Sequence, residues 1–400
     1  MSSGRGAGWP LDEKPLLVFW EVTKACPLAC IHCRANAITT PLPGELARDE
    51  WERLLDQVTG FGRPYPVLVL TGGDPLSRPD VWDIVRGARR RGIPVAMAPS
   101  PSPQLLKNLD NIAREGVSAV SISIDSPDPE VHDRIRRFKG SWEIAVEAVR
   151  ELRSRGVAVQ VNTAVMRSNV EGLPGMVRLL KDLGVDTWEV FYLVPTGRAT
   201  QEEDLTPQEW EDVSAFLYEA SKYGIRVRTS EGPMFRRVSI LSYYSEVTGR
   251  GRELVRRGPL YSKLVSRLLE EVGRPTTEPM VETSGTRDGR GVIFVSYDGY
   301  VYPSGFLPVP LGNVRRGDLA KIYRESRLLQ ALRRGEFRGR CGACEFKDVC
   351  GGSRARAFAY FSDPLAEDPA CPYVPGSASS ALDVAEVMSV WSSRTSRSAR

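Results

Sequence analysis

The chain has 400 residues, of which 42% are hydrophobic and 26% are charged, and its net charge is +4. This composition is typical of a globular protein, and no apolar run is long enough to cross a bilayer. The charge is too small to indicate a nucleic-acid binder. The opening MSSGRGAGWP lacks the apolar core of a signal peptide, so we expect a cytoplasmic protein with neither a membrane nor a nucleic-acid partner.

Apolar runs rich in β-branched and aromatic residues alternate with helix-length amphipathic stretches over the first half of the chain. The strand candidates are residues 16–22, 67–71, 94–98, 119–124, 157–163 and 188–194. Near-continuous apolar strands in a β–α rhythm indicate parallel pairing with both faces buried. We therefore predict an α/β fold, namely a partial (β/α)6 TIM-like barrel, with an open doubly wound sheet as the alternative. In a barrel, chemistry belongs at the C-terminal ends of the strands.

After about residue 230 the alternation of strands and helices ends. A hairpin is predicted around Asp298 and Gly299, at the start of a small C-terminal α+β cysteine-rich domain. IRVRT (225–229) is a candidate for a further strand. The predicted segments are a disordered N-terminus at 1–14, the barrel core at 15–230, a helical linker or insert at 231–290, the cysteine-rich domain at 291–375 and a disordered basic tail at 376–400.

Three of the seven cysteines, Cys26, Cys30 and Cys33, follow the first predicted strand with the spacing C-x3-C-x2-C. A reducing cytosol and an odd number of cysteines both argue against a disulfide framework. The spacing fits three thiolates around a [4Fe–4S] cluster with one iron left open. It also fits a zinc site with His32 as the fourth ligand. The position of His32 directly beside Cys33 is awkward for binding the same ion, which favours iron.

The other four cysteines follow the hairpin with the spacing C-x2-C-x5-C-x20-C. They are Cys341, Cys344, Cys350 and Cys371. Four thiolates in a compact segment suit either zinc or a fully ligated [4Fe–4S] cluster, and the spacing alone does not choose between them.

Polar and glycine-containing motifs follow several of the predicted strands. Glycines allow a backbone to approach a ligand closely, and carboxylates or hydroxyls at strand ends suit polar ligand groups. Each motif alone is equally a turn or a strand exit. The candidates are Gly72, Gly73 and Asp74 after the second strand, Ser123 and Asp125 at the fourth, Asn162 and Thr163 on the fifth, and Gly197 and Arg198 after the sixth. His132 is expected to have a surface or capping role.

The cysteine spacing, GGDP and the strand-end motifs occur in an order that resembles the radical S-adenosylmethionine (SAM) superfamily over about residues 15–200. The resemblance implies that Cys26, Cys30 and Cys33 hold a [4Fe–4S] cluster whose open iron binds SAM. Reductive cleavage of SAM would then give a 5′-deoxyadenosyl radical that abstracts hydrogen from the substrate. Asp74 stands where the family more commonly has glutamate.

The same resemblance assigns roles to the strand-end motifs. It implies that the SAM amino group lies at Gly72, Gly73 and Asp74. The ribose would lie at Ser123 and Asp125, with Asn162 and Thr163 facing the same opening, and the adenine at Gly197 and Arg198. An electron donor such as ferredoxin or flavodoxin is also implied.

The last four cysteines resemble a SPASM or shortened twitch domain, which implies that they hold an auxiliary [4Fe–4S] cluster. Ser304 stands where many SPASM members have a cysteine, so one auxiliary cluster is expected rather than two. Whether this cluster relays electrons or touches the substrate is left open.

SPASM relatives modify either tetrapyrroles or ribosomally made peptides. TKACPLACIHCRANA and CGGSRARAFAYFSDPLAEDPAC resemble the tetrapyrrole group, which implies a haem-pathway decarboxylation or side-chain removal. Arg354 and Arg356 are candidates for binding carboxylates, because guanidinium groups match carboxylates well. The alternatives are a peptide maturase and, from another class, a non-catalytic scaffold with two zinc sites. A scaffold would not need the strand-end motifs, which therefore favour the enzyme.

Overall fold

The computed structural model describes residues 9–282, 286–378 and 382–397. The chain forms two compact units, each built from several segments. The first unit comprises Met1–Asn162, Pro195–Thr200 and Gly285–Arg334. The second unit comprises Thr163–Val194, Gln201–Ser284 and Gly335–Arg400.

The first unit contains a mixed sheet with the strand order β10-β9-β8-β1-β2-β3-β4-β5. Strands β1 to β5 and β8 pair in parallel, whereas β8, β9 and β10 pair antiparallel. The central strand β1 places Leu17 opposite Val67 on one side and opposite Val292 on the other. The strands are β1 Leu17–Thr23, β2 Val67–Gly72, β3 Val95–Met97, β4 Ala119–Ser123, β5 Ala158–Val165, β8 Val292–Val295, β9 Tyr300–Tyr302 and β10 Gly312–Asn313.

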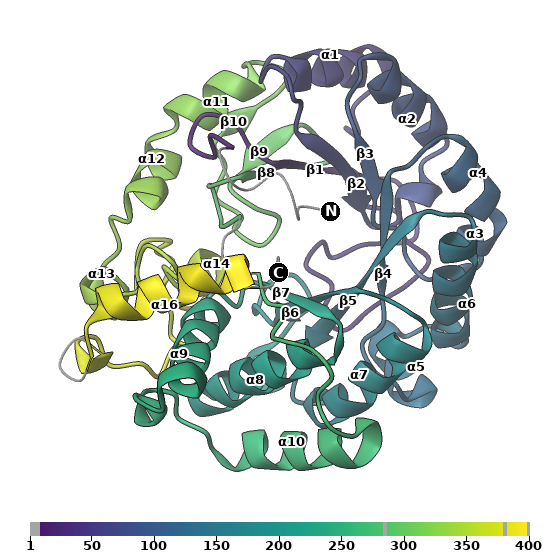
Figure 1. Cartoon of the computed structure of the whole chain (residues 1–400). Coiled ribbons are helices and arrows are strands. Elements are labelled where there is room, and N and C mark those ends of the chain that lie inside the picture. Colours follow the sequence, from purple (N-terminus) through teal and green to yellow (C-terminus); the bar gives the residue numbers. More distant parts are fainter. Residues whose placement is uncertain (1–8, 283–285, 379–381, 398–400) are drawn as a thin grey trace. The chain divides into compact units, whose positions relative to one another are not determined.

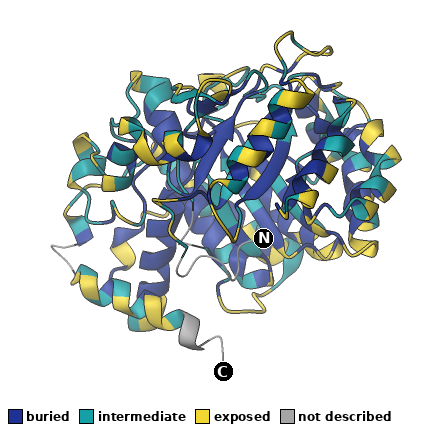
Figure 2. Cartoon of the chain, turned by 90° about the horizontal axis from the view of Figure 1, so that it is seen from above, coloured by how far each residue is buried: buried dark blue, intermediate teal, exposed yellow. Residues whose placement is uncertain are grey.

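Helices follow the parallel strands of the first unit and lie outside them (Figure 1). They are amphipathic, and the first of them buries Trp51, Leu54, Leu55 and Val58. This spacing puts all four side chains on one face of the helix, and Figure 2 shows such helices buried on one side and exposed on the other. The helices are α1 Arg48–Thr59, α2 Val81–Arg90, α3 Pro103–Lys107, α4 Leu109–Arg114, α5 Pro129–Arg136, α6 Ser141–Ser154, α11 Leu319–Glu325 and α12 Arg327–Arg334.

The second unit contains the parallel pair β6 Thr187–Tyr192 and β7 Arg226–Ser230, together with a set of helices. Helix α8 begins with a capping box, in which Thr206 and Glu209 each bond the other's backbone N–H. Helix α9 is buried over most of its length. The helices are α7 Leu173–Asp182, α8 Pro207–Ala220, α9 Met234–Thr248, α10 Pro259–Val272, α13 Gly339–Ala343, α14 Arg354–Phe361 and α16 Val384–Arg397.

The predicted α/β class and partial (β/α)6 barrel are confirmed. Each of the six predicted strands is present within a few residues of its expected bounds, and each is followed by one or more helices. The candidate strand at 225–229 is β7, and the hairpin around Asp298 and Gly299 is formed by β8 and β9. Among the described residues, no helix is both long and apolar enough to span a membrane.

The C-terminal part departs from the predicted segments. The hairpin belongs to the first unit, where β8 pairs with β1, whereas the four cysteines that follow belong to the second unit. The reason is that β8 is apolar throughout and gains two strand neighbours in the sheet. The segment 291–375 is therefore not one compact unit. The insert at 231–290 is helical as predicted, but α9 belongs to the core of the second unit.

The predicted disordered ends are also partly wrong. Residues 1–8 lie outside the described residues, but Lys14 is buried and donates to the carbonyls of Gly62, Arg63 and Pro64. The tail forms α16, in which Val387 and Trp391 are buried on one face. Its composition concealed this helical spacing of apolar residues among serines and arginines.

Candidate functional site

The first three cysteines lie on a loop after β1, and backbone hydrogen bonds join the start of this loop to its end. The N–H of Cys26 donates to the carbonyl of Ile38 at 2.7 Å, and the N–H of Ile38 donates to Lys24 at 3.1 Å. Cys26 and Cys30 belong to a buried apolar cluster against which Cys33 packs. The three thiols therefore gather around one apolar cluster, at the strand end where the sequence predicted them.

Gly197 and Arg198 fasten the same loop. Arg198 donates from Nε to the carbonyl of Cys30 at 2.9 Å and from a terminal nitrogen to Ala37 at 2.7 Å. Gly197 has φ +63°, and a Cβ there would lie 2.3 Å from the carbonyl oxygen of Cys33. The predicted adenine-binding residues are thus in contact with the cysteine loop, and the side chain of Arg198 is engaged there.

Gly72 and Gly73 pack on the backbone of the segment that leads into the cysteine loop. A Cβ on Gly72 would lie 2.3 Å from the carbonyl oxygen of Thr23, and one on Gly73 would lie 2.4 Å from that of Ala25. The N–H of Gly73 donates to Thr23 at 2.8 Å, and the N–H of Asp74 donates to Ala25 at 2.7 Å. The sequence predicted a close approach to a ligand, and the structure shows that these glycines also allow a close approach to the chain itself.

Asp74 is buried and its carboxylate is held by uncharged donors. It accepts from the N–H of Leu76 at 3.1 Å, from the N–H of Ser100 at 3.3 Å and from the hydroxyl of Ser102 at 3.2 Å. Burial raises the pKa of Asp74 to about 6, against the lowering effect of these bonds. The side chain therefore joins the loop after β2 to the loop after β3.

Ser100 is a site residue to which the sequence analysis assigned no role. Its hydroxyl lies 3.3 Å from the sulfur of Cys26 and donates to the carbonyl of Gly73 at 3.2 Å. Burial raises the pKa of Cys26 to about 11, and the Ser100 bond opposes this. Its position in the turn after the third strand was the available signal, because that turn lies at the same edge as the cysteine loop.

Asp125 is fully buried and paired with an arginine. Its carboxylate lies 2.7 Å from a terminal nitrogen of Arg136, and another nitrogen of Arg136 lies 3.8 Å from the sulfur of Cys30. Burial raises the pKa of the Cys30 thiol, and the Arg136 charge opposes this. The expectation that Asp125 binds a ribose does not fit these contacts, because its side chain has no exposed surface. Asp125 instead positions Arg136 beside the cysteine loop.

His132 bonds the backbone of Asp125, next to the end of β4. It is fully buried, and its Nδ1 accepts from the N–H of Asp125 at 3.0 Å. Burial lowers the pKa of His132 to about 4, so the ring is neutral near pH 7. The expectation of a surface or capping role is therefore wrong, and His132 fixes the end of β4.

The remaining candidate residues, Ser123, Asn162 and Thr163, differ in their exposure to solvent. Ser123 is partly exposed and pairs in register with Asn162, which accepts from Gln160 at 2.8 Å. Thr163 is fully buried and accepts from the indole of Trp188 at 2.9 Å. Successive strand residues point to opposite faces, so Asn162 and Thr163 cannot share one opening. Ser123 and Asn162 keep the access that a ligand needs.

The last four cysteines line one pocket in the second unit. These are Cys341, Cys344, Cys350 and Cys371. The sulfur of Cys341 accepts from the N–H of Asp368 at 3.3 Å and lies 3.5 Å from Arg354, and the sulfur of Cys344 accepts from the N–H of Phe346 at 3.4 Å. Burial raises the pKa of Cys371 to about 11, and the Arg237 charge opposes this. Donors and positive charge around the sulfurs suit thiolate ligands.

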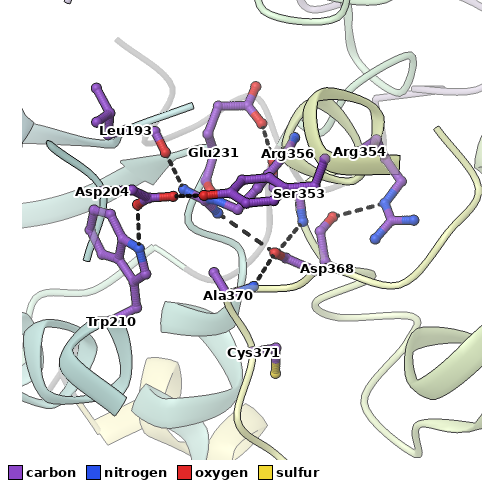
Figure 3. Close-up of polar contacts among 12 residues, drawn as sticks. Leu193, Asp204, Trp210, Glu231, Ser353, Arg354, Arg356, Asp368, Ala370 and Cys371 are labelled. Carbon is purple, nitrogen blue, oxygen red and sulfur yellow. Dashed lines mark hydrogen bonds and ion pairs between the residues drawn. The ribbon is translucent and has the colours of Figure 1, made fainter. Parts of the chain in front are cut away.

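Arg354 and Arg356 do not match their predicted role as carboxylate binders. Arg356 is fully buried and donates to the carbonyls of Leu193 at 2.6 Å and Glu231 at 3.1 Å (Figure 3). It also lies 3.7 Å from Asp368. Arg354 is 3% exposed and donates to the carbonyl of Ala366 at 2.5 Å. Both guanidinium groups are buried and bonded to backbone carbonyls, and Arg354 also lies beside the sulfur of Cys341.

The fit of both sites to iron–sulfur clusters rests on their donors. All seven cysteines are free thiols. Among the described residues, no three or more cysteine, histidine or carboxylate side chains lie close enough together to bind a single metal ion. Three thiols around one apolar cluster and four around one pocket nevertheless supply the sulfur donors that such clusters need.

Comparisons with known proteins agree with this donor set. The sequence model of the radical SAM superfamily matches residues 20–180, and that of SPASM, an iron-sulfur cluster-binding domain, matches residues 287–345. An AdoMet-dependent heme synthase of Oleidesulfovibrio alaskensis is 34% identical over 90% of this chain and 87% of its own length. The chain belongs to the radical SAM superfamily. It is therefore an enzyme, as predicted, and its cofactors are SAM with a [4Fe–4S] cluster and an auxiliary iron–sulfur cluster.

Two further comparisons concern the branch of the superfamily to which the chain is similar and its fold. An AdoMet-dependent heme synthase of Methanosarcina barkeri is 33% identical over 92% of this chain and 99% of its own length. The crystal structure of Streptococcus suis SuiB bound to the precursor peptide SuiA matches with a TM-score of 0.64. It shares 15% identity and covers 90% of this chain and 76% of its own. The radical SAM and haem-biosynthesis-like resemblance inferred from the sequence is confirmed, and the structural match concerns the fold alone.

Proposed function

We propose that this radical SAM enzyme removes carboxyl groups from the side chains of a tetrapyrrole, in the manner of a haem synthase. The observation that carries the proposal is the match to AdoMet-dependent heme synthases at 33–34% identity over nearly the whole length of both chains. A match of this extent includes both the barrel and the cysteine-rich C-terminal part. A peptide maturase is the alternative, and the relatives named as a mycofactocin maturase and a PqqA peptide cyclase match at the lower identity of 27–28% over 90% of this chain.

In this proposal Cys26, Cys30 and Cys33 hold the SAM-binding cluster. When bound, the cluster and SAM supply a radical that abstracts hydrogen from the substrate. The partly buried cysteine loop limits the access of solvent, and a closed site prevents side reactions of reactive intermediates. The hydroxyl of Ser100 lies within hydrogen-bond distance of the Cys26 sulfur, and Arg136 places a positive charge beside the loop.

The contacts to SAM follow from what the structure leaves accessible. Ser123 is the last residue of β4 and pairs in register with Asn162 of β5, so the two are placed to bind the two hydroxyls of a ribose. The backbone of Gly72 and Gly73 lies against the segment leading into the cysteine loop and can accept from an amino group there. We assign support of the cysteine loop, rather than contact with SAM, to the side chains of Asp74, Asp125 and Arg198.

The auxiliary cluster is assigned to the other four cysteines, which line a single pocket. We also propose that a small low-potential carrier such as ferredoxin or flavodoxin supplies electrons, because SAM cleavage consumes one. We further propose that the enzyme works in the cytoplasm, because thiolate-ligated clusters persist in reducing compartments.

The test is an anaerobic reaction of the reconstituted enzyme with SAM, dithionite and iron porphyrins that carry propionate side chains. Each side chain would lose one hydrogen atom to the radical, then carbon dioxide and one electron, which leaves a vinyl group; the electron would pass to the auxiliary cluster or to an added one-electron oxidant. The proposal predicts such vinyl-bearing porphyrin products, detected by mass spectrometry, in proportion to the 5′-deoxyadenosine formed. Unchanged porphyrins in an enzyme that still cleaves SAM would contradict the substrate assignment. Modification of a supplied precursor peptide under the same conditions would instead support the maturase.

A further inference from the structure

The second unit contains a buried ion pair, Arg237 and Glu211, next to the cysteine pocket. Arg237 on α9 and Glu211 on α8 are each 1% exposed. One guanidinium nitrogen donates to Glu211 Oε1 at 3.1 Å, and the other terminal nitrogen bonds Oε2. This two-bond arrangement is geometrically specific. It holds the planar guanidinium in one orientation.

Only the positive end of the pair faces the cysteines. Arg237 lines the pocket together with all four of them, whereas Glu211 is not among the lining residues. The ring of Tyr373 lies 4.4 Å from the Arg237 guanidinium, on another wall of the same pocket. Within the described residues, Nε of Arg237 is buried without a hydrogen-bond partner. A guanidinium does not lose its proton in a protein, so the pocket has a permanent positive charge in its wall.

Stability alone is a weak reason to bury such a pair. Desolvating two charges costs about as much as their attraction returns, and apolar residues of similar size often serve equally well. A cluster held by the four cysteines would change this balance. One-electron reduction of the cluster adds a negative charge inside the protein with no proton to offset it. A buried cation nearby stabilises that charge far more than an exposed one does.

We propose that Arg237 raises the reduction potential of the cluster held by the last four cysteines, and that Glu211 orients the guanidinium and moderates its effect. The net charge near an iron–sulfur cluster is one of the features that set its potential. The inference rests on the proposed assignment of these cysteines to the auxiliary cluster. It assigns a task to a residue that the cysteine motif does not include.

The test measures the midpoint potential of the auxiliary cluster by electron paramagnetic resonance during a dithionite-driven redox titration. The full chain carries Cys26→Ala, Cys30→Ala and Cys33→Ala, so that only the auxiliary cluster gives a signal. In Arg237→Gln we expect the ratio of reduced to oxidised cluster at a given potential to fall about tenfold. For a one-electron couple this is a shift of about 59 mV to lower potential. Arg237→Lys keeps the charge and is expected to stay close to the parent protein.

Two further variants separate electrostatics from folding. Glu211→Gln removes the opposing charge and is expected to raise the potential. Arg237→Gln combined with Glu211→Gln leaves no unpaired buried charge, so it protects folding, and its potential should lie between that of the parent and that of Arg237→Gln. Lys347→Gln is the matched control, because Lys347 lines the same pocket but is partly exposed. Its shift should be the smallest because water screens its charge.

The outcomes distinguish this inference from the function on which it rests. A full set of bound iron with equal potentials in Arg237→Gln, Lys347→Gln and the parent would overturn the role of Arg237 and leave the proposed function intact. Absence of iron from the parent protein with intact Cys341, Cys344, Cys350 and Cys371 would overturn the cluster assignment itself. The ordered series, with Glu211→Gln highest and Arg237→Gln lowest, would support the inference.

Discussion

Both sets of cysteines in this chain have a buried arginine beside them, Arg136 at Cys30 and Arg354 at Cys341, but they differ in the balance between backbone packing and side-chain contacts. At the first set, glycines pack closely on the backbone of the cysteine loop, at Gly197, and of the segment that leads into it, at Gly72 and Gly73. Buried arginines and carboxylates surround the second set, through Arg237, Arg354 and Asp368 among others. The first arrangement leaves polar groups at the strand ends accessible to a small molecule. The second surrounds a cysteine-lined pocket with charged side chains.

The largest expected difference between the sites concerns SAM cleavage. Replacing Cys26, Cys30 and Cys33 together by alanine should abolish 5′-deoxyadenosine formation and remove about half of the bound iron. Replacing Cys341, Cys344, Cys350 and Cys371 together should remove the other half but leave some SAM cleavage, because the open iron lies in the first cluster. Iron analysis and chromatography of the nucleoside product check this. Equal loss of cleavage in both variants would contradict the division of labour.

The next effect tests the side-chain network around the second set. Asp368→Asn should destabilise the protein by about 3–5 kcal/mol, because it leaves the buried Arg356 without its carboxylate. Asp363→Asn is the matched control, since Asp363 pairs with an Arg338 side chain that is 68% exposed, and it should cost about 0–1 kcal/mol. Urea unfolding measures both. Similar losses of unfolding free energy in the two variants would show that the buried Asp368–Arg356 pair stabilises the protein no more than the exposed pair does.

The backbone packing at the first set predicts a smaller but sharp effect. Gly197→Ala should cost roughly 2–4 kcal/mol, because its Cβ would lie 2.3 Å from the Cys33 carbonyl oxygen in a left-handed conformation. Gly156→Ala shares the positive φ, at +75°, but its Cβ would meet no atom within 4 Å. It isolates the conformational strain, at about 1–2 kcal/mol. If thermal unfolding and iron retention respond equally in both, the close packing of Gly197 on the loop is not important.

The smallest effect concerns Asp74, the buried carboxylate of the first site that is held by uncharged donors. Its pKa is raised from 3.8 to about 6 in the folded state, so the folded protein retains this proton more tightly than the unfolded chain. Its contribution to stability is therefore full below about pH 4 and is lost as the pH rises through 6. Asp74→Asn cannot titrate, so the stability difference between the apo forms of wild type and variant should change by about 1–3 kcal/mol over this range. A constant difference would show that the Asp74 pKa is not raised.

Much of the fold and both cysteine sets follow from local patterns. Apolar strands in a β–α rhythm predicted the parallel sheet, and the spacing of Cys26, Cys30 and Cys33 indicated their joint role. The turn residues Asp298 and Gly299 likewise predicted the hairpin between β8 and β9. These features depend on neighbours a few residues apart in the chain, which a single sequence displays directly.

The features that were missed depend on partners far apart in the chain. Gly197 needs to be a glycine because of Cys33, and Arg356 is buried because carbonyls of Leu193 and Glu231 meet it. Nothing near these residues in sequence distinguishes them from an ordinary turn glycine or a surface arginine. The separation of Asn162 from Thr163 could have been foreseen, because alternate strand residues face opposite ways.

The iron content of the protein and its cleavage of SAM together show whether both cysteine sets hold iron–sulfur clusters and whether the protein acts on SAM. Iron and sulfide are counted in the protein purified and reconstituted without oxygen, and dithionite and SAM are then added. The account predicts about eight irons per chain and release of 5′-deoxyadenosine. Two zinc ions per chain with no cleavage of SAM would contradict it and would make both cysteine sets structural.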